Sequence, residues 1–209
     1  MSRAIRLLFL VALSGLAGCS ALDKPVRPSL YDFGPGATAA PAVPAAPLSP
    51  LVLAEIEVTG AFDGTAVLYR LGYADANQLR PYGQARWSAQ PAQLVRLRVR
   101  DQLSRTRVVL DPSDSGVLAR TGGSAPRVLR LDLEEFSHLF EAPDRSSGLV
   151  RLRATLMDNT PAGEKLLGQR SIVVQRPAAT QDAPGGVRAL AAAVDAAAGE
   201  LSQWLAQYK

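Results

Sequence analysis

The two longest strand patterns of the chain are Val128-Leu-Arg-Leu-Asp-Leu-Glu-Glu-Phe-Ser-His-Leu-Phe140 and Gly148-Leu-Val-Arg-Leu-Arg-Ala-Thr-Leu-Met157. Apolar side chains alternate with polar ones in both segments, which is typical of strands with one buried face. A polar segment around Pro143-Asp-Arg-Ser-Ser147 separates them. We therefore expect these two strands to pair antiparallel as a hairpin, with this segment as its loop.

The first of these strands changes parity along its length. Leu129, Leu131 and Leu133 share one face, whereas Phe136 and Phe140 fall on the other. A β-bulge inserts one residue and so moves the following side chains to the opposite face. A bulge near Glu134-Glu135 is therefore predicted, because it would place all five apolar side chains in the core.

Shorter strand patterns flank this hairpin on both sides. Asp63-Gly64 and Asn159-Thr-Pro-Ala-Gly163 mark turns between them. The predicted strands are Leu30–Phe33, Leu51–Val58, Ala66–Leu71, Asn77–Tyr82, Arg107–Leu110 and Leu166–Gln175.

The segment after Trp87 has two possible interpretations. In residues 94–100, Leu-Val-Arg-Leu-Arg-Val-Arg, apolar residues alternate with arginine as in a strand. The same region also gives one helical face, formed by Ala92, Val95, Val99 and Leu103. Ser88 as a cap and Pro91 in the first turn favour the helix.

The last element is an amphipathic helix that begins at Gly185-Gly186. Its apolar residues recur every three or four positions, namely Val187, Leu190, Val194, Ala198, Leu201 and Leu205. Such a stripe is more often core than membrane-binding surface. We therefore expect an α+β fold in which a mainly antiparallel sheet packs against two helices.

The N-terminus has the three regions of a secretory signal peptide, with Arg3 and Arg6 ahead of an apolar run. Leu16-Ala-Gly-Cys19 resembles the bacterial lipobox, in which the cysteine is acylated and becomes the new N-terminus. A transmembrane anchor would need about 17–25 apolar residues, and this run is shorter. Ser20 follows the cysteine, where aspartate would favour inner-membrane retention. We expect lipid attachment at Cys19 and a periplasm-facing location on the outer membrane.

The predicted organisation has three parts. Residues 1–18 form the signal peptide, residues 19–50 the lipidated N-terminus with a short strand and an Ala/Pro-rich linker, and residues 51–209 the folded domain. The nine residues from Ala21 to Ser29 span at most about 30 Å. The body is therefore expected to stand close to its membrane. The spacing of Pro41 and Pro44 also fits a PxxP ligand, but a semi-rigid linker is the preferred interpretation.

The charge and cysteine content argue against nucleic-acid binding, disulfide bonds and cysteine-based metal sites. Removal of residues 1–18 takes away two arginines and no acidic residue, so the formal charge falls from +4 to +2. The chain has no run of five or six basic residues, which argues against nucleic acid as a partner. Cys19 is the only cysteine, so no disulfide or cysteine-based metal site is expected.

We expect no enzyme activity, cofactor or metal site. The sequence contains no Gly-x-Ser-x-Gly elbow and no phosphate-binding loop. His138 is the only histidine, and no matching ligands accompany it. The loop from Asp111 to Ala125 begins like a calcium loop, but its twelfth position is Gly122 instead of glutamate.

The order of these features resembles the ABC-type transport auxiliary lipoproteins that accompany MCE-domain lipid transport systems, including the PqiC-like outer-membrane lipoproteins. After the lipobox come a short strand and an Ala/Pro linker. The residues that carry the resemblance are Tyr31-Asp-Phe33, Val67-Leu-Tyr-Arg70, Asn77, Leu79, Trp87, Pro91, and the strand from Leu129 to Phe136 before an Ala-rich terminal helix. The family also has a helix over the segment from Pro91 to Ser104.

The resemblance implies a non-catalytic component that docks a periplasm-spanning assembly for lipid transport. Its partners would be an MCE-domain protein with its permease and ATPase. Because a periplasm-spanning tube has rotational symmetry, we also expect a ring of copies of this chain. Candidate partner contacts are Asp63 and Gly64 in one loop and Asp111 and Asp114 in another. The alternative is a lipoprotein that activates or assembles a cell-wall or outer-membrane machine. Lipid carriage in the domain's own cavity is a third possibility.

Overall fold

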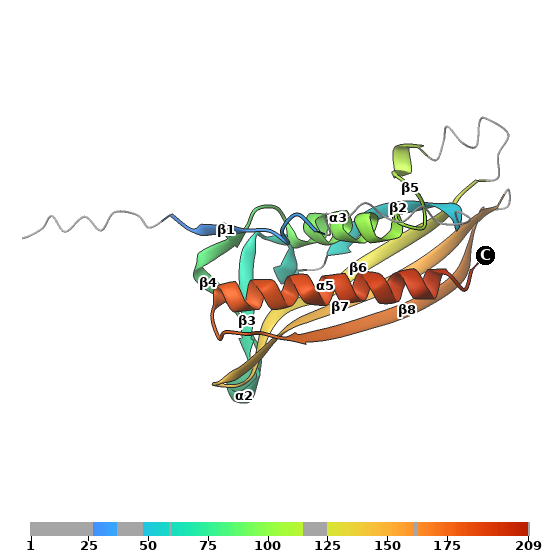
Figure 1. Ribbon diagram of the computed structural model, residues 1–209. Helices are drawn as coiled ribbons and strands as arrows, with labels where there is room; N and C mark the ends of the chain where they lie inside the picture. The colour runs from blue at the N-terminus through green and yellow to red at the C-terminus, as the bar shows by residue number, and fades with distance from the viewer. Residues whose placement is uncertain (1–26, 37–47, 59, 115–124, 161–162, 209) are drawn as a thin grey trace, which may run out of the picture.

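The computed structural model describes residues 27–36, 48–58, 60–114, 125–160 and 163–208. In these ranges eight strands form one sheet, and helices α3 (Pro91–Leu103) and α5 (Ala183–Leu205) pack on one of its faces (Figure 1). The α+β class is therefore confirmed. The predicted signal peptide, Cys19, most of the predicted linker and residues 115–124 of the second loop lie outside the described residues.

The predicted hairpin forms the centre of the sheet. Strands β6 (Arg127–Ala142) and β7 (Arg145–Thr160) pair antiparallel along their length, and β8 (Gly163–Pro177) pairs antiparallel with β7. Only Pro143 and Asp144 separate the two strands, so the predicted loop is too long. Ser146 and Ser147 belong to β7.

The other side of β6 is lined by two shorter strands in tandem. Strand β2 (Leu48–Val58) runs parallel to the first half of β6, and β3 (Ala66–Leu71) runs parallel to its second half. Between them the single turn η1 (Gly60–Asp63) shifts the chain without reversing it, and Gly60 there has a φ of 66°. The predicted mainly antiparallel sheet therefore needs a correction, because the sheet is mixed and contains both parallel and antiparallel pairs.

The remaining strands extend the sheet outward. Strand β5 (Arg107–Leu110) pairs parallel with β2. Strand β4 (Ala76–Trp87), which follows the single turn α2 (Gly72–Asp75), pairs antiparallel with β3 and parallel with β1 (Ser29–Tyr31). Strand β4 is longer than the predicted Asn77–Tyr82 because its end pairs with β1.

The predicted bulge is present. The β6–β7 register shifts between Leu133 and Glu135, and Leu129, Leu131, Leu133, Phe136 and Phe140 are all buried. The parity change in the sequence therefore located an irregularity of the fold.

The ambiguous segment is a helix, as predicted. Helix α3 has Pro91 in its first turn, but its N-cap is Gln90 and not the predicted Ser88, which follows the end of β4. Its predicted inner face, Ala92, Val95, Val99 and Leu103, is buried.

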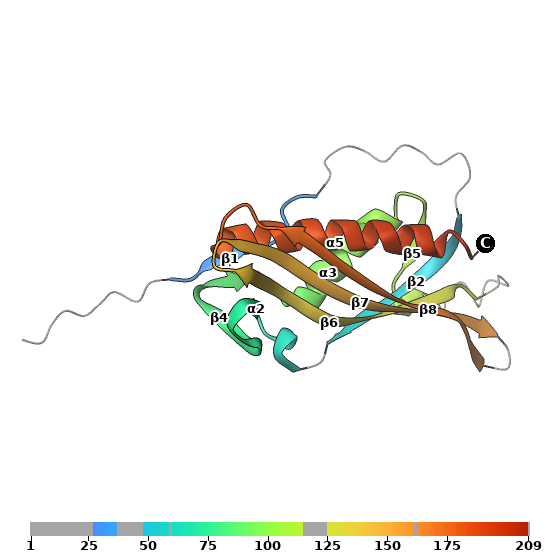
Figure 2. The same cartoon turned by 90° about the horizontal axis from the view of Figure 1, so that it is seen from below.

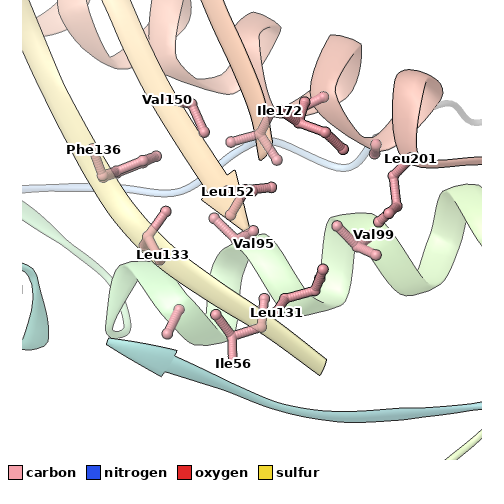
Figure 3. Close-up of a cluster of buried hydrophobic side chains, with 14 of the residues drawn as sticks. Ile56, Val95, Val99, Leu131, Leu133, Phe136, Val150, Leu152, Ile172 and Leu201 are labelled. Carbon is pink, nitrogen blue, oxygen red and sulfur yellow. The ribbon is translucent and has the colours of Figure 1, made fainter. Parts of the chain in front are cut away.

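Helix α5 packs on β7, β8 and α3 through the predicted stripe, every member of which is buried. The carboxylate of Asp182 caps it by accepting a hydrogen bond from the Gly185 amide at 2.8 Å. Figure 3 shows side chains from the sheet and both helices meeting in one core, among them Val95, Leu131, Leu152, Ile172 and Leu201.

The molecule is elongated, and its two ends differ. Figures 1 and 2 both place β1, β4 and the β6–β7 turn at one end, and the C-terminal ends of α5 and β7 at the other. We call the first the tether end, defined by β1 and the Pro143-Asp144 turn.

Candidate functional site

The segment that leads to the predicted lipid attachment is built into the folded body. Strand β1 pairs with Ala85–Trp87 of β4, and the Ser88 amide donates to the Tyr31 carbonyl at 2.8 Å. Just beyond it, the Phe33 ring packs on Trp87 at a centroid distance of 5.5 Å and on Phe136 at 6.1 Å.

The Arg98 side chain of α3 holds the same segment from the helix side. Arg98 donates hydrogen bonds to the carbonyls of Phe33 and Gly34, and its Nε lies 3.3 Å from Oδ1 of Asp195 in α5. A force on the N-terminal segment would therefore reach the core and both helices. Sequence reasoning predicted β1 but not this attachment, since nothing in the pattern pairs Arg98 with Phe33.

The first predicted contact loop is open to solvent. Asp63 ends η1, and its carbonyl and carboxylate accept hydrogen bonds from the Gln90 side chain at 2.9 and 3.2 Å. A Cβ on Gly64 would meet no atom within 4 Å. This turn is therefore fixed to the start of α3 and leaves Gly64 accessible.

In the second loop, Asp111 is not a free recognition group. Its carboxylate accepts hydrogen bonds from Arg96 at 2.5 Å and from Arg100, and these bonds hold the pKa of Asp111 below its usual value. Arg96 also donates to the carbonyls of Leu53 and Ala54, where the β2–β6 register shifts. Asp111 therefore helps to hold the irregular part of β2.

Asp114 lies with Asp111 and accepts a hydrogen bond from the Asp111 amide at 3.2 Å. Asp63 lies apart from both, because Gln90 precedes α3 whereas Arg96 and Arg100 are six and ten positions further along it. At 1.5 Å per residue this separation is about 9–15 Å along the helix. The two loops thus border the same helix without forming one cluster.

His138 is buried at the tether end, against the first turn of α5. Its Nδ1 shares a hydrogen bond with the Tyr82 hydroxyl at 2.8 Å, and Gly186 of α5 approaches its ring. Burial lowers the pKa of His138 to about 4, and burial also raises the pKa of Tyr82, with smaller contributions from Tyr69 and Asp182. Within the described ranges no three His, Cys, Asp or Glu residues gather to hold a metal.

A polar cluster that sequence reasoning missed lies beside the β6–β7 turn. Ser147 and Gln175 both donate to Oε1 of Glu141, and Gln175 also donates to the Ser147 hydroxyl at 2.7 Å. These residues border a cavity of about 310 Å³. No sequence signal marks the cluster, because it depends on the register of three strands.

A second, larger cavity of about 660 Å³ lies between the N-terminal segment and the two helices. Most of the side chains that line it are polar or charged, including Arg98, Asp101, Gln102, Arg105 and Asp195. This lining does not favour acyl chains, so the cavity gives no support to lipid carriage inside the domain. In the described part of the chain, no helix is long and apolar enough to cross a membrane.

The family model described as ABC-type transport auxiliary lipoprotein component matches residues 31–202, from β1 into α5. The chain belongs to this family. The family resemblance inferred from the sequence is therefore confirmed, and membership makes this protein a lipoprotein component that assists an ABC-type transporter.

Solved structures share the fold of this family member. Protein XCC0632 from Xanthomonas campestris has a TM-score of 0.64 at 18% identity, covering 84% of this chain and 94% of that one. A structure described as an uncharacterized protein has a TM-score of 0.59 at 14% identity, covering 86% of this chain and 99% of that one. The hypothetical protein CT253 from Chlamydia trachomatis has a TM-score of 0.52 at 9% identity, covering 78% of this chain and 98% of that one. A search of curated proteins found no match.

Proposed function

We propose that this protein is the outer-membrane component of an MCE-type ABC lipid transport system, where it docks the periplasm-spanning assembly without catalysing a reaction. Membership of the auxiliary lipoprotein family supports the transport role. The lipobox ending at Cys19 supports the anchor, and serine at position 20 supports the outer membrane. The proposed organisation keeps a signal peptide over residues 1–18 and a lipidated segment over 19–50 ahead of the body at 51–209, with β1 and Phe33 of that segment packed on the body.

The attachment of β1 is the observation that carries this proposal. Phe33 and Arg98 fix the segment around β1 to the core, so the proposed anchor would join the body at the tether end and would hold that end, and not the opposite one, near the membrane. An oriented body suits a protein that must present a defined surface to a large partner. The loops at Asp63-Gly64 and Asp111 to Asp114 remain our candidates for that surface.

A ring of identical copies would suit such a partner. A periplasm-spanning tube has rotational symmetry, and closed cyclic assemblies present the same surface repeatedly around an axis. The near-neutral mature charge offers little long-range steering, so shape-specific contact would dominate. We therefore propose a cyclic homo-oligomer at the membrane.

Co-purification tests the proposal. The full lipidated protein, affinity-tagged at its C-terminus, is extracted from membranes in mild detergent, and its partners are identified by mass spectrometry. We expect an MCE-domain protein, with its permease and ATPase. Recovery of a cell-wall synthase or hydrolase instead would support the alternative, a lipoprotein that activates or assembles a cell-wall or outer-membrane machine.

A further inference from the structure

Arg107, at the start of β5, is a buried cation without a counter-charge. Only 7% of this residue is exposed, and its Nε is covered and has no hydrogen-bond partner among the described residues. Within the same ranges its side chain forms no ion pair. Burial of a charge costs free energy unless a partner compensates it. The fold therefore leaves Arg107 in need of an anion.

A second arginine adds to the positive charge at this place. Arg127 of β6 lies across β2 from Arg107. Both side chains point to the helix-bearing face, since Val109 and Leu129, two positions further along each strand, pack against the core. Nη1 of Arg127 donates to the Tyr208 carbonyl at 3.0 Å, just beyond the end of α5. Burial lowers the pKa of Arg107, and the charge of Arg127 lowers it further.

The outer end of the Arg107 side chain is open to a ligand. Its two Nη nitrogens keep some exposed surface, whereas Nε is fully covered. The N–H groups of a guanidinium form a planar fork that matches a carboxylate through two parallel hydrogen bonds. Because so little of the residue is exposed, the matching group has to protrude, as a carboxylate at the end of a side chain does.

This place lies away from the tether end. In Figures 1 and 2, β5 is in the half of the body that holds the C-terminal end of α5, opposite to β1. Strand β5 also leads directly into the loop of Asp111 and Asp114, which is one of the candidate contacts. If the tether end stands at the membrane, Arg107 is remote from lipid headgroups. Its anion is then expected to come from a protein.

We infer that Arg107, with Arg127 behind it, is a carboxylate-binding site that receives an aspartate or glutamate side chain of the protein that docks on this end of the body. The inference deepens the proposed function and rests on it, since it takes the tether end to lie at a membrane.

The first test is a titration of the whole mature chain carrying Cys19→Ser, followed by its amide NMR signals at constant ionic strength. Propionate should bind saturably and shift the Arg107 and Val108 amides, whereas neutral propionamide should not. Arg107→Met should weaken propionate binding about tenfold or more, and Arg105→Met, at an exposed arginine, should not. Equal propionate binding by Arg107→Met and the parent would overturn the inference. Inorganic phosphate binding tenfold more tightly than propionate would do the same, since it would indicate a phosphate site.

The second test is the stability of the same variants. Arg107→Met should raise the urea midpoint, because an apolar side chain of similar length replaces a buried charge that has no partner. A midpoint at or below that of the parent would overturn the inference, since it would show that the guanidinium supports the fold.

The third test returns to the full lipidated protein and its partner in mild detergent. Arg107→Met should reduce the recovered partner about fivefold or more, whereas Arg105→Met should leave it unchanged. Equal recovery with Arg107→Met and the parent would overturn the inference and leave docking intact. Absence of a partner from the parent would count against docking instead, and the propionate titration would still decide whether Arg107 binds a carboxylate.

Discussion

Helix α5 crosses strand β7 at Gly148 so closely that a Cβ there would lie 2.4 Å from the backbone nitrogen of Leu190. The contacting atoms belong to helix backbone, which cannot move aside as a flexible side chain could. Glycine at position 148 therefore sets the distance between the helix and the sheet.

Gly148→Ala should consequently lower the free energy of unfolding by about 1–3 kcal/mol or more, because it overpacks this crossing. Gly64→Ala is the matched control, since a Cβ there meets nothing within 4 Å. Urea denaturation of the two variants measures the difference. Equal midpoints for both would show that α5 does not approach β7 as described.

The attachment of β1 to the folded body can be measured by the hydrogen exchange of one backbone amide. Phe33→Ala removes the ring that packs on Trp87 and Phe136, so the Ser88 amide, which donates to Tyr31, should exchange its hydrogen about tenfold faster or more. Leu30→Ala should leave this rate unchanged, because the Leu30 side chain is 70% exposed. Unchanged exchange in Phe33→Ala would mean that β1 is held by its strand pairing alone.

Burial of His138 predicts a loss of stability in acid. The pKa of His138 is about 4 in the folded protein and about 6.5 in an unfolded chain, so the unfolded state binds the proton more tightly. The stability that comes from keeping His138 neutral is fully present above about pH 6.5. As the pH falls toward 4, the free energy of unfolding decreases by at most about 1.4 kcal/mol per pH unit.

His138→Phe should flatten this part of the stability profile, whatever its effect at neutral pH. Urea denaturation at intervals between pH 7 and pH 4 measures the slope. Tyr82→Phe serves as the control, because it removes the hydroxyl partner and keeps the titrating ring. The same slope in His138→Phe and the parent would assign the acid sensitivity to other groups.

The parts of the fold that were predictable depend on local sequence. The alternation and parity change from Val128 to Phe140 identified β6 and its bulge, and the stripe from Val187 to Leu205 identified α5. Each of these patterns lies within a single strand or helix, where the direction of a side chain follows from its position in the sequence.

The parts that were not predictable depend on pairing between distant segments. Asp63-Gly64 looked like a reversal, yet β2 and β3 both run parallel to β6, which only the register along β6 reveals. Asp111 looked like an exposed loop residue, but Arg96 and Arg100 of α3 bind it. The cluster around Glu141 requires three strands in register, so no single stretch of sequence contains it.

Lipid attachment at Cys19 predicts the fractionation of the protein in cells. Cys19→Ala should leave an uncleaved or soluble form that is absent from outer-membrane fractions. Density-gradient separation followed by immunoblotting measures this, with Ser20→Ala as the variant that keeps the cysteine. Normal outer-membrane recovery of Cys19→Ala would contradict acylation as the anchor.

Docking to a periplasm-spanning partner is tested most directly by photocrosslinking in living cells. A photoreactive residue at Gly64 or Asp114 of the full lipidated protein, with the neighbouring transport proteins present, should trap an MCE-domain protein or a second copy of this chain. The same residue at Arg151, exposed on the sheet, is the control position and should trap markedly less. Adducts with an MCE-domain protein from either loop are the predicted result. Normal expression with no adduct from either loop to that protein or to a second copy would contradict the account.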